Sequence, residues 1–332
     1  MRALPALAVT ALLVVVPQAP AAADRHTVLR FHDPRIVESS GLVDLGDGLI
    51  ATVNDSGDGP YVYVVDRRGR TVGVTDYRGR AIDVESMAPL DRRHVWVGDT
   101  GGNDTPRTSV QVYRVPVGRG DRTVRATGYD LAYPTGTHDA ETLLADPRTG
   151  RLYVVTKALL GGTVYAAPRH LHAERPNRLR PLGKVPGFLT DGTFLPDGDH
   201  VLLRGYTGAA VYTLPGLRRV GPSFRLPAER QGEGIATGPH GRILLSSEGE
   251  HAAVLQIRLP ASVRRALAGS TLRRPSRSSS PSPSPSAPPT GTAAHRARAD
   301  RQRAGSWWAP ASGGAVVLLG GAWLWVHRRR RP

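Results

Sequence analysis

The chain contains no cysteine among its 332 residues, which excludes a disulfide framework and a cysteine-ligated zinc site. Residues 36–260 also lack any helical apolar periodicity of useful length. A nucleophile elbow, an HExxH zinc helix, a phosphate-binding P-loop and the Rossmann glycine pattern are likewise missing. The sequence therefore assigns no catalytic residue. It favours an all-β domain that is stabilised by its own core, because a domain of this size can bury enough apolar surface.

Lysine is also scarce: only two of the 44 basic residues are lysines. The formal net charge is +16, yet residues 270–332 hold eleven arginines and one acid, and Arg2 adds one more positive charge. Residues 24–269 therefore carry only about +5, with no concentrated basic face. This distribution argues against a nucleic-acid partner and is typical of a basic linker and tail beside a membrane.

The two ends of the chain predict export and anchoring. Residues 1–23 have a charged start, an apolar segment and a small-residue cleavage site, which is the pattern of a signal peptide. Residues 270–305 are rich in serine and proline and predict a disordered stalk. Residues 306–327 are apolar with tryptophans at both ends, and the arginine-rich tail 328–332 follows. We therefore expect a single-pass cell-membrane protein with residues 24–269 outside and its C-terminus in the cytoplasm.

A five-fold repeat organises the region between these ends. Each copy places an acidic or amide residue first, a carboxylate or hydroxyl two residues on, and an apolar residue two further, at a period typical of a strand. The copies are Glu38-x-Ser40-x-Leu42, Asp83-x-Glu85-x-Met87, Asp139-x-Glu141-x-Leu143, Asp191-x-Thr193-x-Leu195 and Gln231-x-Glu233-x-Ile235. The copies start 45, 56, 52 and 40 residues apart, and a repeat of this length predicts a propeller.

The strand pattern predicts five four-stranded blades, with six as the alternative if the long spacing from residue 83 to 139 contains another. The fifth repeat supplies only three strands, so we expect residues 26–31 to complete it and thereby close the ring. A short helix is possible at residues 261–267.

The polar ends of the first two strands in each repeat form the candidate site. If these strands are antiparallel, the start of the first lies beside the end of the second, and the ring gathers both sets at one mouth. The candidates for metal or ligand binding are Glu38, Asp55, Asp83, Glu85, Asp99, Asp139, Glu141, Lys157, Asp191, Arg204, Glu233 and Glu248.

Three interpretations of these acids remain open at this point: a site for a metal or a cationic ligand, hydrogen-bonded fasteners of the blades, and general acid–base catalysis. Converging carboxylates repel one another unless a cation or hydrogen-bond donors compensate, and oxygen ligands without histidine or cysteine favour calcium. Alternatively, the acids accept hydrogen bonds from turn amides and fasten the blades.

Several segments resemble a family of exported bacterial β-propeller proteins that are distantly similar to phytase-like and TolB-like propellers. The segments that carry the resemblance are Glu38–Leu42, Asn54–Gly57, Asp83–Glu85, Gly98–Asn103, Asp139–Glu141, Thr156–Lys157 and Gln231–Glu233. In β-propeller phytases, channel acids bind calcium and handle phosphate. The resemblance thus implies a propeller and allows calcium chemistry.

The sequence favours a cell-surface binding platform for an unknown extracellular ligand or protein, with a calcium-binding mouth. The alternative is a calcium-dependent esterase, lactonase or phosphoesterase of the phytase-like type.

Overall fold

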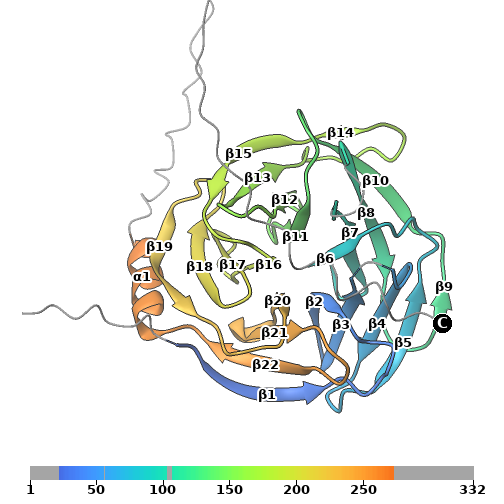
Figure 1. Cartoon of the computed structure of the whole chain (residues 1–332), viewed down its shortest axis with the longest axis horizontal. Coiled ribbons are helices and arrows are strands. Elements are labelled where there is room, and N and C mark those ends of the chain that lie inside the picture. The colour runs from blue at the N-terminus through green and yellow to red at the C-terminus, as the bar shows by residue number, and fades with distance from the viewer. Residues whose placement is uncertain (1–21, 56, 103–106, 273–332) are drawn as a thin grey trace, which may run out of the picture. The chain divides into compact units, whose positions relative to one another are not determined.

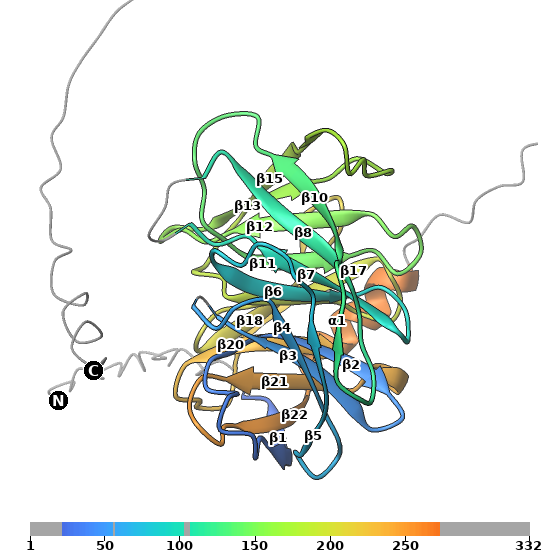
Figure 2. The same ribbon diagram turned by 90° about the vertical axis from the view of Figure 1, so that its right-hand side faces the viewer.

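The computed structural model describes residues 22–55, 57–102 and 107–272 of the chain. These residues form five mainly antiparallel sheets arranged as blades around a common axis (Figure 1), and Figure 2 shows the same sheets from the side. The five-bladed propeller predicted from the repeats is therefore confirmed, and the six-bladed alternative is wrong.

Each blade runs from an inner strand outward. Blade 1 consists of β2 (Ser39–Gly46), β3 (Leu49–Asn54), β4 (Tyr61–Val65) and β5 (Thr71–Asp76). Blade 2 consists of β6 (Val84–Pro89), β7 (His94–Asp99), β8 (Ser109–Pro116) and β10 (Thr127–Ala132). Blade 3 consists of β11 (Ala140–Ala145), β12 (Leu152–Thr156), β13 (Gly162–Ala166) and β15 (Arg180–Val185).

Blade 4 consists of β16 (Asp191–Phe194), β17 (His200–Arg204), β18 (Gly208–Thr213) and β19 (Arg219–Arg225). Blade 5 consists of β20 (Gly232–Thr237), β21 (Ile243–Ser247), β22 (Ala253–Arg258) and, from the other end of the domain, β1 (Asp24–Arg30). The strand β1 pairs antiparallel with β22, so the predicted closure by an N-terminal strand is confirmed. This pairing covers the edge that β22 would otherwise expose.

Two very short strands also link neighbouring blades. The strand β9 (Arg122–Thr123) pairs parallel with β5 of blade 1, and β14 (Asn177–Arg178) pairs parallel with β10 of blade 2. Each comes from the connection inside the following blade, so it covers its neighbour's outer edge.

Five apolar clusters hold the ring together, and each lies between two adjacent blades. The largest side chains of the cluster between blades 2 and 3 include Trp96, Leu143 and Tyr165. The 3-10 turn Pro239–Gly241 joins β20 to β21. The helix α1 (Ala261–Leu272) packs against β19 through Val263. It is longer than the helix expected at residues 261–267.

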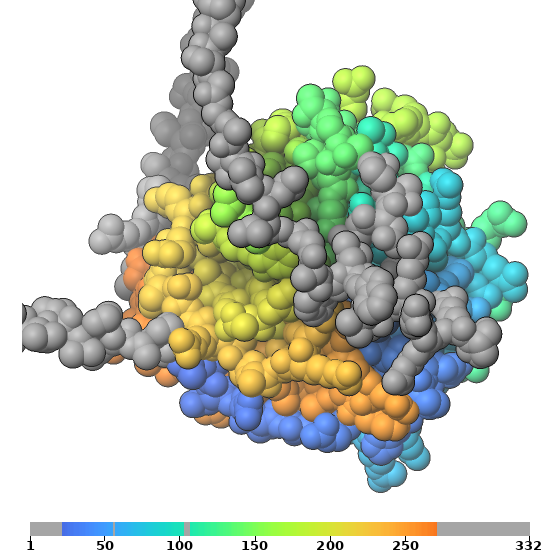
Figure 3. Space-filling view, in the orientation of Figure 1, coloured from blue at the N-terminus to red at the C-terminus, as the bar shows by residue number. Residues whose placement is uncertain are grey.

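In the space-filling view the blades follow one another around the domain (Figure 3). Within the described ranges, no helix is long and apolar enough to cross a bilayer. The predicted transmembrane segment 306–327, the stalk 270–305 beyond Leu272, and residues 1–21 of the predicted signal peptide lie outside these ranges.

Candidate functional site

The inner strands all start at one end of the ring, and the second strands of the blades end there. In four blades a backbone hydrogen bond of 2.8–3.1 Å joins the residue that opens the repeat to a residue one or two positions after the second strand. These bonds are Asp55 N to Glu38 O, Gly101 N to Asp83 O, Lys157 N to Asp139 O, and Glu248 N to Gln231 O. We call this end the mouth. The antiparallel juxtaposition expected from the repeats is present.

Bulges at the start of the inner strands turn side chains into the mouth. The pairing register shifts between Val84 and Ser86 in β6, between Ala140 and Thr142 in β11, and between Gly232 and Ile235 in β20. The inserted carboxylates are Glu85, Glu141 and Glu233, and all three are at least 96% buried. A bulge redirects a side chain without ending the strand, which explains how three acids share the same position in three blades.

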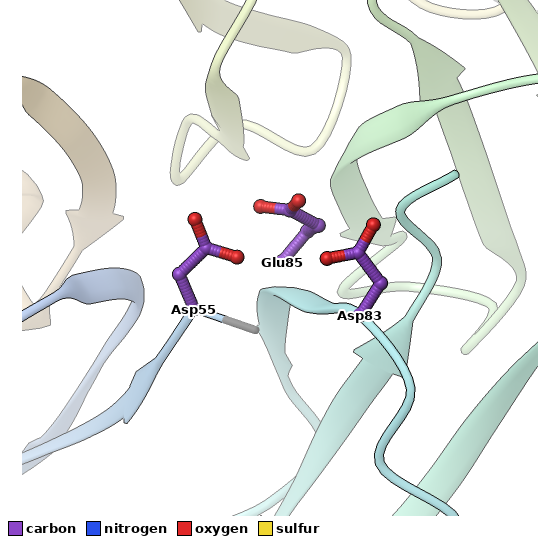
Figure 4. A group of neighbouring side chains, drawn as sticks. All are labelled: Asp55, Asp83 and Glu85. Carbon is purple, nitrogen blue, oxygen red and sulfur yellow. The ribbon is translucent and has the colours of Figure 1, made fainter. Parts of the chain in front are cut away.

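The first carboxylate group joins blades 1 and 2. Asp55, Asp83 and Glu85 each offer an oxygen, and these oxygens lie within 4.8 Å of one another. Figure 4 shows the three carboxylates turned toward a common space, with Glu85 behind the other two. The Oε1 atom of Glu85 is buried and accepts no hydrogen bond from the described residues.

Glycine at position 101 permits this close approach. A Cβ atom there would overlap the Asp83 carboxylate and stand 2.8 Å from Glu85 Oε1. The backbone after β7 therefore leaves no room for a side chain beside the first carboxylate group. Gly101 was not among the sequence candidates, although the glycines that follow Asp99 are a signal of close backbone approach.

The second carboxylate group joins blades 2 and 3 and shares Glu85 with the first. Glu85, Asp139 and Glu141 also offer oxygens within 4.8 Å of one another. The ammonium of Lys157 donates to Glu141 Oε1, and Gly102 N donates to Asp139 Oδ1 at 3.1 Å. The Lys157 ammonium thus supplies a positive charge to the second carboxylate group.

A third acidic pair lies on blade 5. Gln231 Nε2 donates to Glu248 Oε1 at 2.5 Å and to Glu233 Oε1 at 3.2 Å. The other carboxylate oxygen of Glu233, Oε2, is buried without a described partner. Glu38 forms a backbone bridge to Glu248, which brings blade 1 beside blade 5.

Burial and mutual repulsion raise the pKa values of the mouth carboxyls. Burial, followed by the charges of Glu141, Asp55 and Asp83, raises the pKa of Glu85 well above its usual range. Burial also raises the pKa of Glu141, although Lys157 acts in the opposite direction. Burial raises the pKa of Glu233 to about 7 and, together with the charge of Glu233, that of Glu248 to about 8. A bound cation would favour the ionised forms that the mouth otherwise disfavours.

Three sequence candidates lie at this end of the strands but are held in buried hydrogen bonds apart from the two carboxylate groups. Asp99 is fully buried and accepts from Arg107 Nη1 at 2.8 Å and from Asp83 N at 2.9 Å. Asp191 is fully buried, with Oδ2 accepting from Ile235 N at 2.8 Å. Both carboxylates therefore fasten neighbouring segments, in agreement with the alternative interpretation of the acids.

Arg204 is the third of these candidates. It is fully buried and donates to Glu229 Oε2 at 2.8 Å and to the Gly234 carbonyl at 3.2 Å. The sequence did not point to two partners, Glu229 of Arg204 and Arg107 of Asp99, because neither residue belongs to the five-fold repeat. The structure thus brings together Glu38, Asp55, Asp83, Glu85, Asp139, Glu141, Lys157, Glu233 and Glu248 at the mouth.

The other end of the ring is closed. Residues of all five inner strands, among them Leu42, Met87 and Leu143, line a cavity of only about 10 Å³ there. This volume is at the lower limit for a single water molecule.

Comparisons with solved structures find distant similarities. No family model matches the chain, and no curated protein is found to match it. A luciferin-regenerating enzyme has 10% identity and a TM-score of 0.43 over 72% of this chain and 96% of its own. A glucose dehydrogenase has 12% identity and a TM-score of 0.43 over 71% and 100%. The soluble aldose sugar dehydrogenase of Escherichia coli has 8% identity and a TM-score of 0.43 over 71% and 99%.

Proposed function

We propose that the chain is a cell-surface binding platform whose mouth holds calcium. The observation that carries the calcium site is Glu85 Oε1, a buried oxygen without a described partner on a carboxylate that faces Asp55 and Asp83. Buried polar atoms are almost always hydrogen-bonded, so an unpaired carboxylate oxygen among other carboxylates points to a cation as its partner. A site made only of carboxylate oxygens is of the kind that binds calcium, which prefers oxygen ligands.

The distribution of exposed apolar side chains supports a binding role. The large apolar side chains that are exposed in the described part of the chain all lie in or beside loops on the mouth side. They are Val37, Tyr61, Ile82, Leu159, Leu160 and Phe188. Apolar side chains concentrated on one face are typical of an interaction surface. We infer that an extracellular ligand or protein covers the mouth.

A hydrolase assay separates the platform from the alternative of a calcium-dependent hydrolase. With p-nitrophenyl acetate, a γ-lactone and p-nitrophenyl phosphate, we expect no turnover above the rate without protein, in calcium or in chelator. The reason is that no nucleophile–base pair is evident among the mouth residues described above. Calcium-dependent turnover that is lost in Glu85→Gln but kept in Glu250→Gln would contradict the platform and establish the hydrolase. Glu250 is a suitable control because it is an exposed acid.

We also propose display outside the cell membrane through the segment 306–327, with residues 270–305 as the stalk. Protease added to intact cells is expected to release a soluble fragment of about the size of residues 24–269, because the serine- and proline-rich stalk offers accessible peptide bonds. Immunoblots of medium and cells would measure the release. Full protection of the domain in intact cells, with cleavage after lysis, would contradict this topology.

A further inference from the structure

The second carboxylate group is already occupied by a positive charge of the chain itself. Lys157 extends from the end of β12 and donates to Glu141, and its side chain is only 12% exposed. On its other side, the ammonium nitrogen lies 5.0 Å from the Phe188 ring centre and 5.9 Å from that of Tyr206. The ammonium is therefore held between a carboxylate and two aromatic faces.

The two carboxylate groups otherwise match closely. Each consists of three oxygens within 4.8 Å, each draws on two adjacent blades, and Glu85 belongs to both. Among the residues that the structure describes, no lysine or arginine is hydrogen-bonded to Glu85, whose Oε1 atom is buried without a partner there. A carboxylate with two oxygens can bridge two cations, so the shared position of Glu85 is suited to a pair of metal ions.

We propose that the mouth binds two divalent cations bridged by Glu85, and that Lys157 occupies the second position until the second cation displaces it. The first cation binds at Asp55, Asp83 and Glu85. The second binds at Glu85, Asp139 and Glu141, and the released ammonium stays against Phe188 and Tyr206. The inference rests on the proposed function, since it requires that the first carboxylate group binds calcium.

This arrangement makes the second binding step weaker than the first. The second cation must separate the Lys157 ammonium from Glu141 and must approach a cation that is already bound. The ammonium already contacts the rings of Phe188 and Tyr206, and these contacts keep it beside the mouth after its release from Glu141. A hydrogen bond to a charged group contributes about 1.5–3 kcal/mol. Removal of the ammonium should therefore tighten the second step by about 10- to 100-fold.

The scarcity of lysine gives a direct test. The chain has two lysines, Lys157 and the exposed Lys184 on β15. Reductive ¹³C-methylation of the full chain in detergent gives one dimethyl-lysine signal for each, and calcium chloride is then added. We expect the Lys157 signal to shift during the second binding step while the Lys184 signal stays in place. Assignment comes from Lys157→Met and Lys184→Met, each of which removes one signal.

Calorimetry of the unmodified chain gives the independent measurement. Wild type and Lys184→Met are expected to bind two calcium ions in two steps, and Lys157→Met to bind the second at least tenfold more tightly. One calcium ion with an unmoved Lys157 signal would overturn the inference and leave the proposed function intact. Two ions with an unmoved Lys157 signal would overturn the displacement. No bound calcium would overturn the proposed function as well.

Discussion

Replacement of Arg204 by methionine is expected to lower the free energy of unfolding by about 3–5 kcal/mol. Removal of one partner of a buried ion pair leaves the other charge buried and uncompensated, and that loss has this magnitude. Here Glu229 would be left with a side chain only 3% exposed, and its Oε1 atom already lacks a described partner. The Gly234 carbonyl on β20 would also lose its donor.

In a domain of this size, 1 kcal/mol corresponds to roughly 2–4 °C in melting temperature, so we expect a decrease of about 6–20 °C in Arg204→Met. Circular dichroism melting curves measure it. Arg225→Met is the matched control, because Arg225 is an exposed arginine at the end of neighbouring β19. The double variant Arg204→Met with Glu229→Met should recover much of the loss, since neither charge then remains buried. A single variant that melts within 2 °C of wild type would contradict the structural role of Arg204.

The five-fold repeat predicted the blades because the inner strand of each blade carries the same pattern of residues at a period of two. The three-stranded fifth repeat was enough to predict the closing strand, since an open ring would expose an edge. The links made by β9 and β14 could not be predicted in the same way. Each has only two residues, which is too short for any alternation to appear in the sequence.

The sequence predicted the mouth in part. The candidates that join the carboxylate groups differ from those that do not by one position relative to the end of the second strand. Asp55 and Lys157 directly follow the residues that pair with the inner strands, Asn54 and Thr156. Asp99 and Arg204 are themselves such paired residues, opposite Val84 and Asp191. A shift of one residue in a strand moves a side chain to the other face, which accounts for the separate partners of Asp99 and Arg204, namely Arg107 and Glu229.

Blade 4 departs from the repeat for a related reason. The strand β16 pairs with β17 without a register shift, from Asp191 opposite Arg204 to Phe194 opposite Val201. Without the bulge, no side chain in β16 is redirected as Glu85 is in β6. The only sequence signal was the threonine at position 193, where three other repeats have glutamate. Bulges depend on the pairing of two strands, so a single strand's pattern does not specify them.

Calcium is expected to raise the melting temperature of the wild-type protein by about 5–11 °C over that in chelator. A ligand at a hundredfold excess over its dissociation constant stabilises the native state by about 2.7 kcal/mol, and each kcal/mol corresponds to roughly 2–4 °C. The physical reason is the relief of repulsion among Asp55, Asp83 and Glu85. Glu85→Gln should abolish the calcium effect, and the exposed control Glu250→Gln should preserve it.

The calcium effect should also increase with pH. In the cation-free protein the pKa of Glu248 is raised to about 8 and that of Glu233 to about 7, above the ordinary value of 4.5. Groups whose pKa is raised by folding favour the protonated native state, so their contribution to stability is lost as pH rises from about 5 to 9. Calcium counteracts the negative charge that develops. The calcium-induced shift at pH 8.5 should therefore exceed that at pH 6.

Calorimetric titration of calcium into wild type and Glu85→Gln tests the cation site at the mouth most directly. The account predicts saturable binding of at least one calcium ion per chain in wild type, loss of that binding in Glu85→Gln, and unchanged binding in Glu250→Gln. Absence of calcium binding in folded wild type, or binding of equal affinity and stoichiometry in Glu85→Gln, would contradict it.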